Sequence, residues 1–402
     1  MTPWFVPVIF ASFAATVLYS DEQLGLEEGW EKWEDDYVLQ DSIADAGDLD
    51  GQQDINNAHA LHKHIYPSQS SNGAMYSSAA PPFKSGWGII AFGDWLYWRA
   101  NEEGLNYAVQ SLEFAGRGFG PGIATRGIDG KVHHISPGYH SGFRIGASAV
   151  LPWDKWDLQL YWTSYHNDSD SSVKQKPLQV AWPILLNINN IPLALSAKAD
   201  WKIHFNVLDL ELGRSFFVAK HLSIRPFIGF EAAWIKQNLN ADYFNITLFQ
   251  FGQVFPGDDI SSRTRNHFSG YGLRGGLNTK WPLFWGISLM GNVSFSLLCS
   301  DFDISQYEKN IHGSPRTSLK DDLHLTSQSL QMFAGICWEW QFMKNRCYFN
   351  LHAGWEQQIW FDQNQMNIFL NDSSLRANVG NTINQQGDLT LSGLTLGAAF
   401  GF

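Results

Sequence analysis

The chain of 402 residues has few cysteines and few charges. Its three cysteines, Cys299, Cys337 and Cys347, form no CxxC pair and no Cys/His spacing typical of zinc, and they exclude a secreted disulfide scaffold. Charged residues make up 16% of the chain, whereas about a quarter is usual in soluble globular domains. The balance of 39 acidic to 27 basic residues gives a net charge of −12, which disfavours nucleic acid as a partner.

Beyond its first residues the chain also lacks a segment that resembles a membrane-spanning helix. The uncharged runs 177–197 and 281–300 are long enough, because about 20 apolar residues span a bilayer. The first run contains prolines and several asparagines, which a lipid-facing helix tolerates poorly. In the second, apolar and polar side chains alternate strictly from 287 to 297, which is the period of a strand. Neither run is expected to be a helix.

Aromatic residues and glycine are abundant: 28 Phe, 18 Trp, 13 Tyr and 36 Gly. Alternating segments of roughly ten residues are joined by short links and by long polar links in turn. Aromatic residues stand at the segment ends, as at Trp153, Trp156, Trp162, Tyr165, Trp281 and Trp285. This pattern is typical of an antiparallel transmembrane β-barrel with short periplasmic turns, long extracellular loops and aromatic girdles. A soluble β-sandwich, the alternative all-β fold, does not explain the aromatic ends.

Eleven alternating segments are predicted as strands. They lie near 87–99, 104–113, 139–151, 156–166, 199–215, 222–236, 268–278, 284–298, 329–340, 347–361 and 389–402. Single-chain bacterial barrels have an even strand number and both termini in the periplasm, so an odd count implies a missing strand, within 60–83 or 125–136. We predict about 12 strands, with 10 to 14 allowed, and hence a narrow lumen. Within 201–212 the alternation changes parity near Val207, which suggests a β-bulge.

The front of the chain differs from this body. Residues 1–20 are uncharged and apolar and are predicted to be a signal peptide, with a single anchor helix as the alternative. Residues 21–85 contain 13 acidic and three basic residues, a net charge of −10, and are predicted to form an acidic flexible arm. The barrel is assigned to 86–402. Asp54 with His59, His62 and His64 could bind a metal, but a solvated arm is the preferred interpretation, so no metal site is predicted.

Alternation also predicts which charged side chains line the lumen, because Lys or Arg on the lipid face costs about 2–4 kcal/mol at the bilayer midplane. These residues either orient and filter small solutes or pair across the lumen and brace the wall. The predicted pore-lining residues are Arg144, Asp157, Lys202, Asp209, Glu211, Arg225, Glu231, Arg274, Glu339 and Glu356.

The C-terminus has the pattern Thr395-x-Gly397-x-x-Phe400-x-Phe402, in which the apolar residues of 394–402 share one face. It resembles the C-terminal β-signal by which outer-membrane proteins are recognised for insertion. We therefore predict that these four residues form an insertion signal for the barrel assembly machinery.

Several short motifs occur in the order and spacing of one family. They are Leu96-Tyr97-Trp98-Arg99-Ala100 with 103–108, Pro137-Gly138-Tyr139 with 143–146, 156–163, 208–214, 222–229, 270–274 and Trp355-Glu356-Gln357-Gln358. Over about 87–402 the chain resembles the Legionella-type major outer membrane protein family, pore-forming barrels also found in chlamydia-like bacteria. The resemblance implies a β-barrel porin of a Gram-negative outer membrane without catalytic residues.

The predicted function is that of an outer-membrane porin, a narrow water-filled diffusion channel for small hydrophilic solutes and ions. The alternative is a surface-exposed structural protein or adhesin anchored by the barrel. No enzyme activity, cofactor or nucleic-acid partner is expected, since no motif orders the loop Ser and His residues into the set that a lipase or protease needs. The expected partners are outer-membrane lipids, the assembly machinery and small solutes, and association between copies is left open.

Overall fold

A computed structural model describes residues 87–110, 131–152, 156–182, 192–219, 221–250, 253–310, 315–342, 347–372, 379–384 and 387–402. All regular structure in these ranges is β-strand. None of the described segments forms a helix long and apolar enough to cross a membrane. The predicted signal peptide, 1–20, and acidic arm, 21–85, lie outside the described residues.

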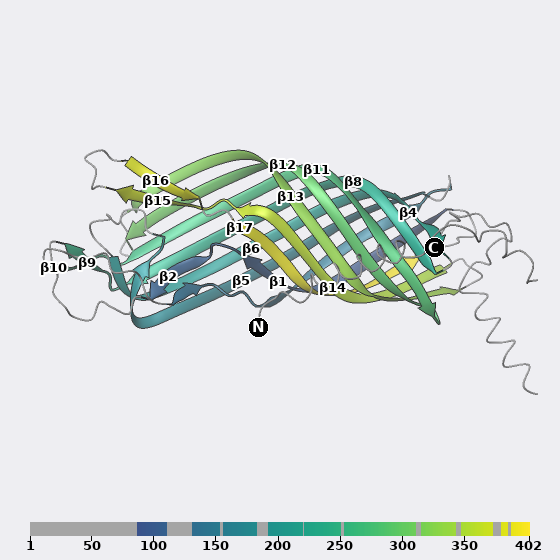
Figure 1. Ribbon diagram of the computed structural model, residues 1–402, viewed down its shortest axis with the longest axis horizontal. Coiled ribbons are helices and arrows are strands. Elements are labelled where there is room, and N and C mark those ends of the chain that lie inside the picture. Colours follow the sequence, from purple (N-terminus) through teal and green to yellow (C-terminus); the bar gives the residue numbers. More distant parts are fainter. Residues whose placement is uncertain are drawn as a thin grey trace, which may run out of the picture. The chain divides into compact units, whose positions relative to one another are not determined.

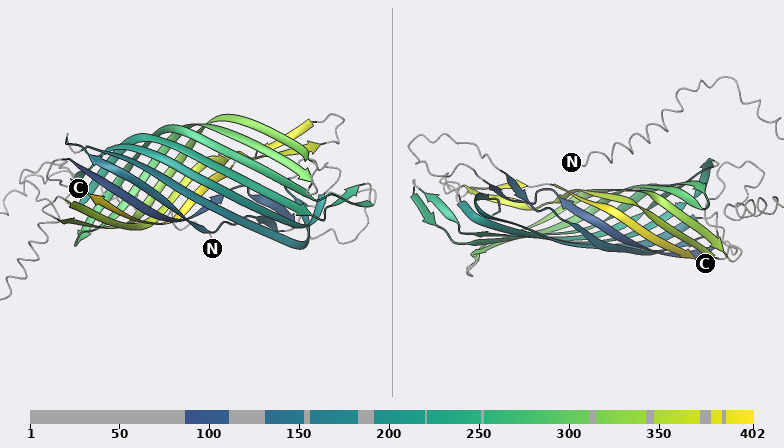
Figure 2. Two further views of the ribbon diagram at one scale, coloured as in Figure 1. Left: turned by 180° about the vertical axis from the view of Figure 1, so that it is seen from behind. Right: turned by 90° about the horizontal axis from the view of Figure 1, so that it is seen from below.

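Ten antiparallel strands form a closed barrel (Figures 1 and 2). Each pairs with its neighbours in the ring, and the last strand pairs with the first from Leu389 opposite Glu102 to Gly401 opposite Ile90, so the ring has no free edge. The ring consists of β1 (Gly88–Glu102), β4 (Tyr139–Val150), β5 (Trp156–Val180), β6 (Pro192–Arg214), β8 (Leu222–Phe244), β11 (Ile260–Phe284), β12 (Ile287–Asn310), β13 (Pro315–Phe342), β14 (Cys347–Asn364) and β17 (Gly387–Gly401).

Short strands outside the ring extend the end of the barrel opposite the C-terminus (Figure 1). There β9 (Thr247–Gln250) pairs with β10 (Gln253–Pro256), and β15 (Asn367–Asp372) pairs with β16 (Val379–Asn384). At the other end, β7 (Phe216–Ala219) pairs with the start of β8. The C-terminus lies at the end of the short connections, as expected for the periplasmic side.

The ring has ten strands, at the lower limit of the predicted range. The predicted segment near 104–113 is the strand that does not belong: as β2 (Asn106–Gln110) it pairs with β3 (Val132–His134) and with the far end of β5, outside the ring. The eleven predicted segments therefore include one that is not a strand of the ring, and none of the strands of the ring is missing from them. β3 occupies part of the 125–136 range considered for a missing strand and is likewise outside the ring.

Several segments predicted as long loops continue as strands. β5, β6, β8, β11, β12 and β13 run through much of 166–197, 238–267 and 299–327, and β13 has 28 residues, whereas about 9–11 suffice to cross a bilayer. Beyond the bilayer the outward positions are polar, as at His166, Asp168 and Asp170 of β5. These extensions lack the apolar outer face from which the membrane strands were predicted, so the sequence pattern did not identify them as strands.

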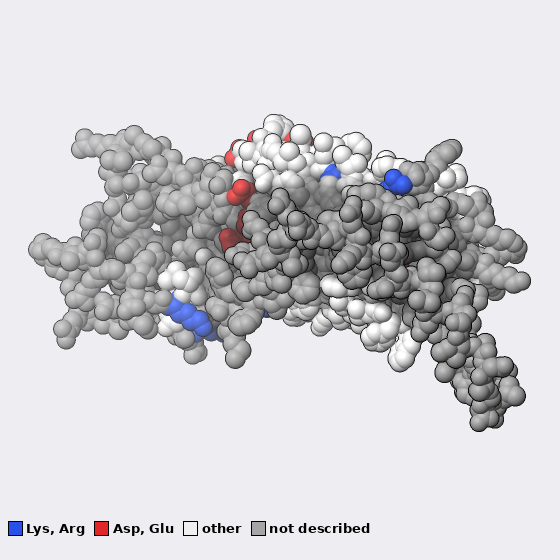
Figure 3. Space-filling model, turned by 45° about the vertical axis from the view of Figure 1, so that its right-hand side comes forward, with Lys and Arg blue, Asp and Glu red and all other residues white. Residues whose placement is uncertain are grey.

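The outward face nearer the C-terminal end is apolar and exposed. Trp95, Trp162, Trp281, Trp338 and Trp355 are each between 39% and 46% exposed, too much for a protein surface that faces only water. In Figure 3 the described surface is mostly uncharged, with a few small groups of charged side chains. Trp153 lies outside the described residues, and the other Trp residues predicted at strand ends lie on this band. The prediction for Tyr165 is wrong, because its side chain is 2% exposed and belongs to the buried cluster inside the barrel. The band fits the hydrocarbon layer of a membrane and its aromatic girdles.

Inside the barrel, the half away from the C-terminus contains a buried apolar cluster beside buried polar side chains such as Gln237, Asn266 and Glu308. Trp98, Trp201, Phe205, Phe268 and Trp360 belong to one buried cluster, and each is at most 2% exposed. Along β6 this cluster takes the inward positions Trp201, Ile203, Phe205 and Val207 in register with both neighbouring strands. The predicted bulge near Val207 is therefore absent: the strand keeps its parity, and the interior changes from polar to apolar.

Candidate functional site

Nine of the ten predicted pore-lining residues point into the barrel. Glu339 is half-buried and pairs with Lys280 near the C-terminal end of the lumen. The other eight, Arg144, Asp157, Asp209, Glu211, Arg225, Glu231, Arg274 and Glu356, are between 1% and 8% exposed. The prediction for Lys202 is wrong, because the parity of β6 does not switch. Lys202 lies on the outer surface, where its Nζ is 2.7 Å from Asp168 Oδ2.

Arg144 of β4 joins four strands. Its Nη2 donates to Glu356 Oε1 of β14 at 2.6 Å, its Nη1 to Asp94 Oδ2 of β1 at 3.2 Å, and its Nε to Thr163 Oγ1 of β5 at 3.0 Å. Glu356 also accepts a bond of 3.0 Å from Thr395 Oγ1 of β17. This side of the lumen is thus bridged from the first strands of the ring to the last.

Arg225 of β8 and Arg274 of β11 form the other half of the network. The Arg225 guanidinium lies 2.6 Å from Asp157 and 3.0 Å from Glu211. Arg274 Nη1 donates to Glu231 Oε2 at 2.5 Å, and the same guanidinium lies 3.4 Å from Asp209 and 3.3 Å from Glu211. Glu211 is shared between the two arginines and joins them.

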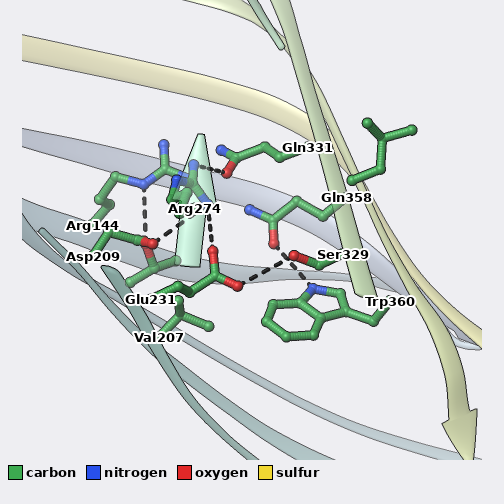
Figure 4. A pocket seen from close by; sticks show the side chains of 11 residues that line it. Arg144, Val207, Asp209, Glu231, Arg274, Ser329, Gln331, Gln358 and Trp360 are labelled. Atoms are coloured by element: carbon green, nitrogen blue, oxygen red, sulfur yellow. Dashed lines mark hydrogen bonds and ion pairs between the residues drawn. The ribbon is translucent and has the colours of Figure 1, made fainter. Parts of the chain in front are cut away.

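Gln331 of β13 joins the two halves, and Figure 4 shows its bond to Arg274. It accepts from Arg274 Nη2 at 2.6 Å, and its Nε2 donates to Glu356 Oε1 at 2.7 Å. Ser296 of β12 completes the ring with a bond of 2.9 Å to Glu231. Every strand of the barrel contributes to this connected set, which we call the lumen network. Its charged members are Arg144, Arg225, Arg274, Asp94, Asp157, Asp209, Glu211, Glu231 and Glu356.

The sequence prediction missed Asp94, Gln331 and Thr395 as members of the network. Asp94 alternates with the outward Trp95 along β1, so the parity argument used for the other strands would have placed it inward. Gln331 carries no charge and gave no signal of this kind. Thr395 was assigned to the insertion signal, yet its hydroxyl lies between Trp98 Nε1, which donates to it at 3.2 Å, and Glu356.

The lumen network closes the lumen at its own level. A cavity of about 10 Å³ lies among Arg144, Asp209, Arg274 and their neighbours, which is about the space of a single water molecule (Figure 4). Charged side chains lining an open aqueous channel would be accessible to solvent, and these are almost inaccessible. The sequence led us to expect a water-filled channel, but in this conformation the paired charges fill the lumen at this level.

Burial makes this arrangement costly unless each charge is compensated, because removing an ion from water costs several kcal/mol. Three arginines face six carboxylates in the network, an excess of three acidic groups when all are ionised. Among the described residues, no group of three or more His, Cys, Asp or Glu side chains is arranged to hold a metal ion. The ion pairs of the network can hold the barrel wall together. If these pairs separated, their excess of carboxylates would give the lumen an acidic lining.

Gly397 of β17 permits the close packing of Asp94 and His352. A Cβ at position 397 would lie within 3.0 Å of both Asp94 Oδ1 and His352 Nε2, closer than real Cβ atoms approach other atoms. We expect Gly397→Ala to lower the free energy of unfolding by about 1–3 kcal/mol through overpacking, measured by urea titration of protein folded into lipid vesicles. Gly93→Ala is the matched control, since its Cβ would meet nothing closer than 3.9 Å. Equal stability of the two variants would contradict this role for Gly397.

Comparison with known proteins agrees with the barrel and its apolar band. The sequence profile described as Legionella pneumophila major outer membrane protein precursor matches residues 79–402. No curated protein matches the chain.

Similar solved structures are outer-membrane proteins of low identity. The outer membrane protease OmpT from Escherichia coli is 9% identical, with 83% of this chain and 99% of that chain covered and a TM-score of 0.35. A major outer membrane protein from Thermus thermophilus is 10% identical, with 79% and 99% covered and a TM-score of 0.28. The Pseudomonas putida toluene transporter TodX is 10% identical, with 79% and 90% covered and a TM-score of 0.30. Similarity this low carries no argument about activity. From the family match, the chain belongs to the Legionella pneumophila major outer membrane protein family and is a β-barrel of a Gram-negative outer membrane.

Proposed function

We propose that this barrel is a gated pore for small hydrophilic solutes and ions, closed in the present conformation by the lumen network and by the buried cluster beyond it that contains Trp98, Trp201 and Trp360. The observation that carries the proposal is the composition of the lumen at bilayer level. A barrel that serves only as an anchor could be filled with apolar side chains, and replacing buried ion pairs by apolar residues is often neutral or stabilising. Nine buried charged groups are therefore better explained by a passage that becomes hydrated when the pairs separate.

The proposed open state prefers cations. The network contains three more carboxylates than arginines, and in a narrow passage of low dielectric each charge acts strongly on a passing ion. The overall composition left the sign of this preference open, since 85–402 carries a net charge of only −2.

Single-channel recording in planar bilayers across a salt gradient tests the proposal. Wild type is expected to show brief openings of low conductance and a cation-selective reversal potential. Both Arg144→Gln and Glu356→Gln should lengthen the openings, because each removes one side of the shortest contact of Arg144. Their reversal potentials should move in opposite directions, towards cation preference for Arg144→Gln and away from it for Glu356→Gln.

Leu158→Ala, on the lipid-facing surface, is the control and should leave gating and selectivity unchanged. If the two network variants open the pore without opposite shifts of the reversal potential, these residues lie outside the permeation path. If neither wild type nor either variant conducts, the second candidate holds: a surface-exposed structural or adhesive protein that the barrel anchors. The buried apolar cluster in the outer half of the barrel favours this second candidate.

A further inference from the structure

A row of basic side chains crosses the outer surface of four adjacent strands. His166 of β5 lies opposite His204 of β6, His204 lies opposite Lys236 of β8, and Lys236 lies opposite His267 of β11. All four occupy outward positions; the first three are exposed and His267 is half-buried. The imidazole rings of His166 and His204 stack with their centroids 4.1 Å apart. We call these four residues the basic row.

The basic row lies directly beyond the apolar band. On the same four strands the outward residues nearer the C-terminal end are Trp162, Leu208, Phe230 and Tyr271, which are 39%, 38%, 63% and 54% exposed. Aromatic side chains at the end of an apolar band mark the boundary between hydrocarbon and headgroups. The basic row is therefore at the height of the lipid headgroups, on the extracellular side.

Both basic and acidic groups surround the row. Lys202 and Arg265 stand at the next outward positions of β6 and β11. The nearby acids are Asp168, which pairs with Lys202, Asp200, which also acts on Lys202, and Asp303 and Asp301 of β12, of which Asp303 lies opposite His267. The pKa of His204 is lowered by burial and then by the charges of His166, Lys236 and Lys202. The pKa of His267 is also lowered, by burial first and by Lys236 and Arg265, against the opposing effect of Asp303. A lowered pKa favours the uncharged imidazole, so the fixed positive charges in and beside the row are those of Lys236, Lys202 and Arg265, and these attract an anion.

We propose that the basic row binds the phosphate group of a phosphorylated lipid of the outer leaflet. The acyl chains of that lipid would lie against the exposed side chains of Trp162, Phe230 and Tyr271 on the same strands. Phosphate oxygens accept charge-assisted hydrogen bonds from ammonium and imidazolium groups. Basic residues beside a membrane surface are a general means of recognising anionic headgroups. The proposal rests on the location of the protein in the outer membrane and does not require that the barrel conducts.

Binding to lipid A, a phosphorylated glycolipid, tests the proposal by native mass spectrometry of the full-length protein in detergent. Wild type should retain lipid A and bind the same glycolipid without its phosphates at least about tenfold more weakly. The double variant His204→Gln/Lys236→Gln should lose at least about tenfold in affinity for lipid A. Lys320→Gln, an exposed lysine on β13, is the matched control and should bind as wild type does.

The pH dependence provides a second readout. A bound phosphate favours the protonated imidazole and raises the pKa of His204, so lipid A should bind more tightly at low pH and more weakly as the pH rises through that pKa. Inorganic phosphate at equal concentration should not displace the lipid, since it lacks the contacts of the acyl chains. Equal binding of the dephosphorylated glycolipid, or unchanged binding by the double variant, would overturn the proposal. A double variant that only changes the oligomeric state would show that the row contacts a second copy instead.

Discussion

Replacing Phe400 with Asp, or deleting Phe402, is expected to leave the chain unassembled in the periplasm. Phe402 closes the seam of the barrel: its amide donates to Ile89 O at 3.0 Å, and the Ile89 amide donates to Phe402 O at the same distance. Phe400 is 44% exposed on the outer face and lies in a row of rings with Phe342 and Phe402. Either change removes part of the predicted insertion signal, and the deletion also opens the junction of β17 with β1.

The heat-dependent shift of a folded barrel on gels, together with its fractionation with the outer membrane, measures this effect. Phe400→Tyr keeps an aromatic ring at the same position and should assemble normally. Should Phe400→Asp and the Phe402 deletion both reach the outer membrane at wild-type levels, the C-terminal residues would have no role in recognition.

Arg274→Met should produce the largest loss of stability of any single change in the lumen. Arg274 contacts Glu231, Asp209 and Glu211. Its removal leaves the buried Glu231 and Asp209 carboxylates without their counter-charge and leaves Glu211 with Arg225 alone. Breaking a buried ion pair from one side costs about 3–5 kcal/mol, so the free energy of unfolding in lipid vesicles should fall by about this amount. Removing one acid as well, in Arg274→Met/Glu231→Gln, should recover part of the loss.

Arg263→Gln is the control for this measurement. Arg263 lies on the same strand, β11, but its side chain is exposed on the outer surface, and a change there should stay within about 0.5 kcal/mol of wild type. If Arg274→Met unfolds at the same urea concentration as this control, the lumen network contributes nothing to the stability of the wall.

The barrel could be predicted because its membrane band requires strict alternation. Ten of the eleven segments found from that alternation are strands of the ring. The extensions of β5, β6 and β13 beyond the band could not be found in this way. Their outer face meets water, and the inner face of β6 is lined by apolar residues such as Trp201, so the polarity of the two faces is reversed there.

The same reversal explains which lumen residues were assigned correctly. Residues at bilayer level, such as Arg144 and Glu356, must point inward, and parity alone places them. Lys202 lies beyond the band, where a charged residue faces water on the outer surface. The pairings themselves required the register of the closed ring. Arg144 and Glu356 are 212 positions apart in the chain, and nothing in either local sequence indicates that they meet.

The length of that separation constrains the order in which the protein can fold. Asp94 and Arg144 come from the first hairpin of the barrel, whereas Glu356 and Thr395 belong to the last one. Contacts between distant parts of a chain form late and slow the folding of β-proteins. Until the final hairpin forms, Arg144 lacks its shortest contact, the one with Glu356. In a partly formed sheet the Arg144 guanidinium must therefore remain hydrated. When β17 pairs with β1, the sheet loses its open edge and, in the same step, Arg144 gains its carboxylate partner Glu356.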